Sequence, residues 1–249
     1  SILLPLSVFK FMSVLINYKS NTLKKKIENI VLFVDDSFNI SGLKKYISSK
    51  EYSYISDLII VTDKKAQIVT YDINSKRKVI LVSINEKITS AGAEILGGKF
   101  YNRFKKTKQI NFSIYTDTVS SKLKNFIGHF LHGMKLKSYV FEKYKSKKEK
   151  IKIYVNVVGK NKPSVKDQNK FKSIEEGTFF ARDLVSEPGN ILHPDEYAKR
   201  LNSLKKNGLK VTIYDKKKLK KLGMNALLGV GMGSVRGSYL VTLEWNGAK

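Results

Sequence analysis

The 249-residue sequence contains no cysteine, which excludes disulfide bonds and thiolate metal sites and suits a reducing cytoplasm. It also lacks a long apolar run. The apolar stretch at residues 1–9 contains Pro5 and is followed by Lys10, so it is too short to span a membrane. No basic segment precedes this stretch and no small-residue cleavage site follows it, which argues against a secretory signal. The sequence therefore indicates no membrane partner.

Acidic residues are scarce, because 21 Asp and Glu oppose 47 Lys and Arg and the formal net charge is +26. Residues 1–163 hold 31 basic and 12 acidic side chains, and residues 164–249 hold 16 and 9. One interpretation is a surface that binds nucleic acid by releasing counterions from phosphate. The other is coding bias in an AT-rich genome, since almost all of the positive charge is lysine and arginine is rare. Any weak, nonspecific nucleic-acid binding is expected in residues 1–163.

The composition is otherwise that of an ordinary globular protein, with 42% hydrophobic residues and a length sufficient for one large domain or two smaller ones. Met12 precedes the first strand-like segment, Ser13 to Ile16. We expect residues 1–11 to be an upstream extension of the natural start, the alternative being a membrane-associating extension.

Strand and helix patterns alternate along the chain and predict an α/β fold. Helices are expected at residues 41–47 and 89–104, although three glycines weaken the second prediction. In the strand at residues 110–114, the apolar residues Ile110, Phe112 and Ile114 alternate with polar ones, which predicts one solvated face. The expected strands of the first part are residues 13–16, 30–34, 66–73, 79–84, 110–114 and 151–157.

Apolar residues spaced by three and four from Val119 to Met134 predict one long amphipathic helix. His129 and His132 lie on it and would in principle share a metal ion, but no carboxylate accompanies them in the sequence. We therefore expect them to serve packing. A second long helix is predicted from Ser164, a suitable N-cap, to Val185.

The last part of the chain contains a helix pattern from Asp195 to Asn207, ended by Gly208, and strands at residues 211–214 and 239–245. These patterns predict an αβ unit of a mainly parallel sheet.

Three further groups of residues are candidates for a functional site. The glycines of the segment Gly229 to Ser234 match neither a dinucleotide-binding loop nor a P-loop, so a turn that ends a strand is the better interpretation. Ser234 has no histidine placed by a local motif to activate it. Asp35 and Asp36 follow a buried strand, where a cation site and a solvated turn are the alternatives.

The segment from Ala181 to Pro194, read ARDLVSEPGNILHP, is followed by LGM at 222–224, LGVGMGS at 228–234 and the strand at 239–245. With the earlier segment GMKLKSY at 133–139 and the residues Phe141 to Lys148, this order resembles the cytosol, or leucyl, aminopeptidases. In that family a helix ends at the glycine that Gly133 matches. The resemblance covers residues 80–245. Ser186 and His193 depart from it, since the family usually has Asn and often Thr there.

The resemblance implies an N-terminal α/β domain with a macro-like mixed sheet, a linker helix and the start of an α/β catalytic domain. The boundaries expected are residues 12–163, 164–186 and 187–249. It also implies a cytoplasmic, hexameric enzyme that removes N-terminal amino acids from peptides with two divalent metal ions, Mn or Zn. We expect the chain to be the first part of such an enzyme.

In the family the metal ligands and catalytic residues follow the region that matches Trp245, beginning with Gly-Lys-Gly and Phe-Asp-x-Gly-Gly motifs. Neither motif occurs in this sequence, so no catalytic, cofactor-binding or metal residue is assigned to it and the piece alone is expected to be inactive. Two other functions stay open, a basic noncatalytic module that binds nucleic acid and a subunit that serves only in oligomer assembly.

Overall fold

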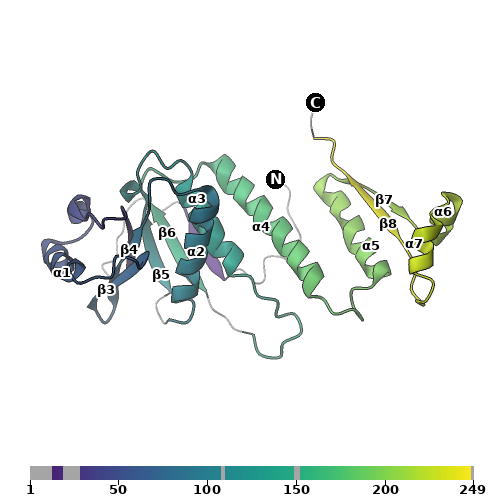
Figure 1. The fold of residues 1–249 in the computed structure, drawn as a ribbon, viewed down its shortest axis with the longest axis horizontal. Coiled ribbons are helices and arrows are strands. Elements are labelled where there is room, and N and C mark those ends of the chain that lie inside the picture. Colours follow the sequence, from purple (N-terminus) through teal and green to yellow (C-terminus); the bar gives the residue numbers. More distant parts are fainter. Residues whose placement is uncertain (1–12, 19–28, 108–109, 149–151, 248–249) are drawn as a thin grey trace. The chain divides into compact units, whose positions relative to one another are not determined.

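A computed structural model describes residues 13–18, 29–107, 110–148 and 152–247 of the chain. The expected extension at residues 1–11, Met12 and Ile151 lie outside them. The chain divides into two compact units, whose border falls between Phe179 and Phe180. Each unit is an assembly of helices and a sheet of its own (Figure 1).

The larger unit is built on a mixed sheet that has six strands among the described residues, in the order β1-β6-β5-β2-β4-β3. All neighbouring pairs are parallel except the hairpin of β3 and β4. The strands are β1 (Val14–Asn17), β2 (Asn29–Val34), β3 (Ile68–Asn74), β4 (Arg77–Ser83), β5 (Asn111–Tyr115) and β6 (Ile153–Val158). The α/β fold with a mixed sheet predicted from the sequence is confirmed.

Each face of this sheet has its own hydrophobic core. Helices α2 (Ser90–Phe104) and α3 (Phe126–Lys137) cover one face, where Phe100, Phe112 and Phe130 are fully buried (Figure 1). Helix α1 (Ser49–Ile59) and the 3-10 helix η2 (Ser41–Lys45) cover the other face over β2 and β4. Because both faces of β2 are covered, all six of its residues are buried, and those that follow Asn29 form a continuous apolar run.

The expectation of one solvated face for the strand at residues 110–114 is wrong. Ser113 in β5 is fully buried, although it points to the face opposite Phe112 and Ile114. Ser113 lies in the middle of β5, between β6 and β2 inside the sheet, whereas Asn111, at the start of the strand on the same face, is exposed. A polar residue in alternation does not by itself distinguish a solvated face from a covered one.

Helices α2 and α3 approach closely at two glycines. A Cβ atom on Gly97 would lie 1.9 Å from the carbonyl oxygen of Phe130, and one on Gly133 would lie 1.9 Å from that of Glu94. Gly97, one of the three glycines that weaken the helix prediction, is thus one of the two residues that allow these helices to pack. Gly133 lies inside α3, so the expectation that a helix ends there is wrong.

Two other helix predictions need correction. Helix α3 begins at Phe126, and Val119 follows the short 3-10 helix η3 (Thr116–Thr118), so the apolar spacing from residue 119 spans two elements. The helix expected at residues 41–47 is a 3-10 turn, η2, followed by α1, whose capping box joins Ser48 and Glu51.

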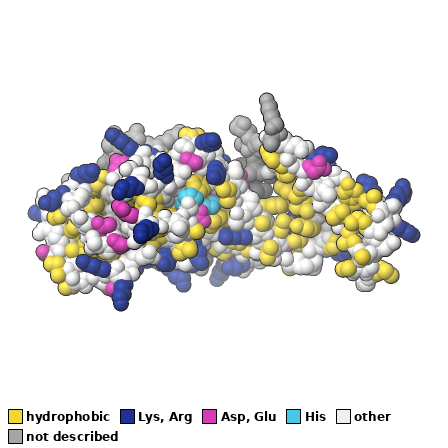
Figure 2. Space-filling model, turned by 45° about the horizontal axis from the view of Figure 1, so that its top comes forward, with side chains coloured by type: hydrophobic (Ala, Val, Ile, Leu, Met, Phe, Trp, Pro, Cys, Tyr) yellow, Lys and Arg dark blue, Asp and Glu magenta, His cyan; other side chains and the backbone are white. Residues whose placement is uncertain are grey.

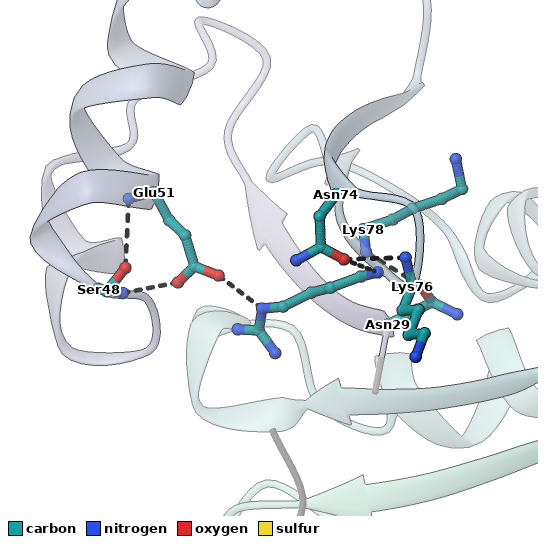
Figure 3. Close-up of polar contacts among 7 residues, drawn as sticks. Asn29, Ser48, Glu51, Asn74, Lys76 and Lys78 are labelled. Carbon is teal, nitrogen blue, oxygen red and sulfur yellow. Dashed lines mark hydrogen bonds and ion pairs between the residues drawn. The ribbon is translucent and has the colours of Figure 1, made fainter. Parts of the chain in front are cut away.

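Polar side chains tie α1 to the sheet (Figure 3). Glu51 accepts a hydrogen bond from the Ser48 backbone N–H at 2.8 Å and one from Arg77 Nε at 2.5 Å. Asn74 closes the β3–β4 turn by accepting from the N–H groups of Lys76 and Arg77. Asn29, which is buried, joins β2 to both neighbours, because its side chain accepts from the Lys78 N–H and donates to the Asn111 carbonyl. These bonds fix the end of the sheet against α1.

The long helix α4 (Val165–Ser186) begins after Ser164, whose hydroxyl accepts from the Asp167 N–H at 3.1 Å. Its first part packs on α3. Phe171 contacts the rings of His129 and His132, and Phe179 stacks on Tyr139 at a centroid distance of 5.5 Å. The helix predicted from Ser164 to Val185 is present.

The smaller unit contains two strands among the described residues, and they are antiparallel. The expectation of a mainly parallel sheet is therefore wrong for this part. The sequence predicts both strands, but the direction in which they pair is not a local property of the sequence. Gly208 ends the preceding helical segment with φ +88°. The elements are α5 (Pro194–Asn202), η4 (Ser203–Asn207), β7 (Lys210–Tyr214), α6 (Lys216–Lys221), α7 (Asn225–Val230) and β8 (Leu240–Glu244).

In the part of the chain that the structure describes, no helix combines the length and apolar character needed to cross a membrane.

Candidate functional site

The segment between α4 and α5 is held by an ion-pair cluster around Arg200. Its Nη1 donates to Glu187 Oε1 at 2.9 Å, and its Nε donates to Glu196 Oε1 at 3.0 Å. The Glu187 side chain is 1% exposed. Although partial burial acts to lower it, the pKa of Arg200 is raised by its hydrogen bonds with the two carboxylates. The loop that follows α4 is thus fixed to the last turn of α5 by a charge-assisted pair.

A second polar contact joins the start of α5 to β8. The Tyr239 hydroxyl donates to Asp195 Oδ1 at 2.7 Å, and this hydrogen bond lowers the pKa of Asp195 and raises that of Tyr239. His193 Nδ1 lies 3.2 Å from Asp195 Oδ2 but lacks hydrogen-bonding geometry there. His193 occupies the N-cap position of α5, and its side chain accepts no capping hydrogen bond within the described residues. The departure from threonine at this position removes a common N-cap residue.

These contacts border an apolar groove within the smaller unit, with a volume of about 820 Å³. Its walls come from the end of α4, from α5, from α7 and from β8, and include Leu184, Leu192, Leu201, Leu227 and Leu243. Several large side chains of this unit are strongly exposed, among them Val230, Met232 and Trp245. Figure 2 shows hydrophobic side chains gathered over this unit. The unit therefore offers exposed apolar surface, which is a feature of surfaces that bind a ligand or partner.

The glycine segment near Ser234 forms a turn after helix α7, not after a strand as expected. The Ser234 N–H donates to the Gly231 carbonyl at 3.1 Å, and Ser234 Oγ accepts from the Arg236 N–H at 3.1 Å. Gly229 lies in α7 itself. The hydroxyl of Ser234 therefore stabilises a turn.

The two histidines of α3 each contact a carboxylate, contrary to the sequence-based expectation. His129 Nδ1 lies 2.8 Å from Glu94 Oε1 of α2, and His132 Nδ1 lies 2.9 Å from Glu175 Oε1 of α4. Glu175 is 3% exposed and its Oε2 lies 3.3 Å from Lys135 Nζ. Each histidine thus joins α3 to a different helix. The partners are 35 and 43 residues away, so no local pattern could reveal them.

Asp35 and Asp36 act in the turn that follows β2. Asp35 Oδ1 accepts from Ser37 Oγ at 2.7 Å and from the Asn39 N–H at 2.9 Å, and Asp36 Oδ2 accepts from Asn85 Nδ2 at 2.8 Å. Burial acts to raise the pKa of Asp35, but these hydrogen bonds hold it below its usual range. Within the described residues, no three His, Asp or Glu side chains are grouped as a metal site requires.

Sequence comparison relates the chain to one peptidase family. A profile of the cytosol aminopeptidase family, catalytic domain, matches residues 179–249. The probable cytosol aminopeptidase of Brucella anthropi is 31% identical over 230 residues, which cover 87% of this chain and 45% of that protein. The probable cytosol aminopeptidase of Phytoplasma mali is 34% identical over 173 residues, covering 67% of this chain and 34% of that protein. The chain thus spans less than half the length of these relatives.

Solved structures share the fold. A mutant of tomato leucine aminopeptidase superposes with a TM-score of 0.73 at 16% identity, over 96% of this chain and 52% of that one. The bottromycin maturation enzyme BotP, solved in complex with Mn, gives a TM-score of 0.66 at 16% identity, over 88% and 45%. The profile match begins at the border between the two compact units, and the fold similarity extends over both of them. The chain is therefore a partial member of the cytosol aminopeptidase family.

Proposed function

We propose that the protein to which this chain belongs is a metal-dependent aminopeptidase that removes N-terminal amino acids from peptides. The observation that carries the proposal is the match of residues 179–249 to the catalytic domain of the family, together with relatives named cytosol aminopeptidase that align over most of the chain. Peptides are then its substrates.

The residues described here do not fit the pair of divalent ions, Mn or Zn, that the family resemblance implies. They contain no group of three or more His, Asp or Glu side chains placed to hold a metal ion, and the sequence contains neither family motif. BotP is a relative in fold whose structure contains Mn. We therefore assign no metal ligand and no catalytic step to any residue of this chain.

We propose a supporting role for the smaller unit instead. Arg200 holds the loop after α4 through Glu187, and Tyr239 holds the start of α5 through Asp195. These contacts keep α5 and β8 together around the apolar groove. In a catalytic domain, such a scaffold positions the residues that contact the substrate.

The larger unit, residues up to Phe179, is proposed as the N-terminal domain and α4 as the connection to the catalytic part. The family resemblance also supports a homo-oligomer, with a hexamer as the expected state, and the relatives' name supports a location in the cytosol.

Hydrolysis of leucine p-nitroanilide tests the proposal. We expect the protein expressed from the complete gene to release nitroaniline when Mn²⁺ or Zn²⁺ is added and to stop when the metal is chelated. The 249-residue chain alone should show no metal-dependent turnover. A complete protein that binds the metal and folds but cleaves no aminoacyl anilide or peptide would contradict the proposal.

One observation favours a second candidate, the noncatalytic binding of nucleic acid: the formal net charge of +26. Figure 2 shows Lys and Arg side chains dispersed over the visible face of the larger unit among Asp and Glu. Dispersed charge should bind duplex DNA weakly, without sequence preference, and lose nearly all affinity between about 50 and 200 mM salt. If, in a competition gel shift at the higher salt, the protein still binds one DNA sequence more tightly than random duplex, that result would favour this candidate instead.

A further inference from the structure

The larger unit has a crevice where the chain leaves β2. Strands β4 and β5 lie on either side of β2 and run parallel to it. After β2 the chain crosses one face of the sheet through η2 and α1, whereas after β4 it crosses the other face through α2 to reach β5. Connections that diverge in this way leave an open crevice at the carboxyl ends of the strands, which is where open α/β sheets bind ligands.

A cavity of about 380 Å³ occupies this position. Its volume falls within the range of small-molecule sites, roughly 300–1,000 Å³. The floor is apolar and buried, and the rim is polar and exposed, as in sites that bury the body of a ligand and orient its polar end. Buried lining residues are Phe33, Val34, Leu43, Ile84 and Val119, and Tyr46 is half-buried beside them.

The charge of the rim is opposite to that of the chain. Asp35, Glu86 and Asp117 line the cavity with one cation, Lys45, so the lining carries a formal charge of −2 in a protein of +26. Lys122 approaches Glu86 only to 4.0 Å, and both side chains are mostly exposed, so this pair screens the rim little. The carboxylates would favour a positively charged ligand.

We propose that this cavity binds a small organic cation, an amine or guanidine attached to an apolar or aromatic body. The body lies on Phe33, Leu43 and Ile84, and the cation faces the carboxylates of Glu86 and Asp117. The Tyr46 ring also lines the wall of the site, with the Lys45 ammonium 5.1 Å from its centroid. The site lies entirely in the larger unit, outside the part that matches the catalytic domain, so it does not depend on the proposed peptidase activity.

Tyramine and 4-ethylphenol are the probes, because they share an aromatic body and differ in the ammonium group. Binding to the 249-residue chain is measured by ligand-observed NMR and by calorimetry at neutral pH and low salt. We expect saturable binding of tyramine at millimolar concentration, the affinity that about ten non-hydrogen atoms normally supply. 4-Ethylphenol should bind about tenfold more weakly. Equal affinity for the two probes, or no saturation by tyramine, would overturn the proposal.

Gly42 provides a variant that blocks the site. It lines the cavity, and apart from its chain neighbours no described atom lies within 4 Å of where its Cβ would be, so Gly42→Phe adds a bulky side chain at the cavity wall with no clash at the Cβ. Gly177 of α4 is an exposed glycine with the same open surroundings and lies away from the cavity, which makes Gly177→Phe the matched control. Gly42→Phe should weaken tyramine binding at least tenfold with an unchanged melting temperature, and Gly177→Phe should leave binding intact.

Charge is tested separately with Glu86→Gln and Asp117→Asn. Asparagine at position 117 retains the oxygen that accepts from the Lys160 N–H, so the fold is preserved. Each change should weaken tyramine binding about threefold and leave 4-ethylphenol unaffected. If Gly42→Phe and both charge changes leave tyramine affinity unchanged, tyramine binds elsewhere on the protein and the proposed site is refuted.

Discussion

At the residue scale, Glu51 joins the N-terminus of α1 to the β3–β4 hairpin. Burial acts to raise its pKa, but the hydrogen bonds from Arg77 and Ser48 hold it below the ordinary value of 4.5. A carboxylate whose pKa is lowered by folding stabilises the protein above the unfolded pKa, and this stability is lost as the pH falls through the folded pKa. The contribution of Glu51 is thus present at neutral pH and disappears in acid.

We therefore expect Glu51→Gln to cost about 1–2 kcal/mol near neutral pH, and we expect this cost to shrink between neutral and acidic pH as the wild-type carboxyl becomes protonated. Urea unfolding midpoints of both proteins across this pH range measure the difference. Glu86→Gln, which removes an exposed carboxylate, is the control for the loss of one negative charge. A constant difference at all pH values would mean that Glu51 acts through its shape and not its charge.

Glu175 shows what a buried carboxylate requires. It is 3% exposed in α4 and contacts His132 and Lys135 of α3, and its charge contributes to raising the pKa of Tyr18 to about 12, after burial of the phenol itself. Removing one partner of a buried ion pair leaves the other charge uncompensated. The cluster therefore fixes α4 on α3 only as long as all its members are present.

Glu175→Ala should destabilise the larger unit by about 3–5 kcal/mol, since Lys135 loses its buried counterion. The neighbouring residue, Glu176, supplies a control. Burial raises the pKa of Glu176 and so disfavours the charged form that an ion pair would need. Glu176→Ala should cost less than about 1 kcal/mol. Thermal and urea unfolding of the two variants compares them directly, and similar losses would show that Glu175 contributes no more than an ordinary helix residue.

At the scale of elements, the contact of α2 with α3 depends on the absence of side-chain atoms. Gly133→Ala would place a methyl group 1.9 Å from the Glu94 carbonyl oxygen, which forces the helices apart. We expect a loss of about 3 kcal/mol or more, as for an overpacked core.

Gly177→Ala is the matched control for this change. Gly177 lies on an exposed position of α4, and no described atom would contact its Cβ. The substitution should stabilise the helix by about 0.5–1 kcal/mol through its better propensity. Melting temperatures of the two alanine variants should therefore shift in opposite directions, and a harmless Gly133→Ala would show that α2 and α3 separate easily.

At the scale of the whole molecule, the two compact units differ in how much core they own. The larger unit has two hydrophobic clusters on a covered sheet, whereas the smaller one has few fully buried side chains and an exposed apolar groove. We expect residues 1–179 to fold as a separate polypeptide and residues 180–249 not to unfold cooperatively alone.

The position of the boundary is tested with a third piece, residues 1–163, which ends where the sequence suggested a domain limit. It lacks Phe171, Glu175 and Phe179, and it exposes the surface of α3 and the ring of Tyr139 that they cover. Circular dichroism melting and limited proteolysis should find it less stable than residues 1–179. Equal stability of the two pieces would mean that α4 adds nothing to the larger unit.

Local patterns in the sequence determined the element types and the fold class. The apolar run of β2, the hairpin of β3 and β4 around Asn74, the N-cap of α4 and the end of η4 at Gly208 are each set by residues within a few positions of one another. The order of the motifs from Ala181 to Trp245 likewise indicated the family without any structure, because it depends only on spacing along the chain.

Only the tertiary structure decided which of these patterns meet. It buried Ser113 inside the sheet, paired β7 with β8 in antiparallel orientation and brought Glu94 and Glu175 to the histidines of α3. It also placed the ends of β2, β4 and β5 around one acidic cavity. These outcomes join residues tens of positions apart, and periodicity carries no information on such pairs, since burial and contact depend on how whole elements pack.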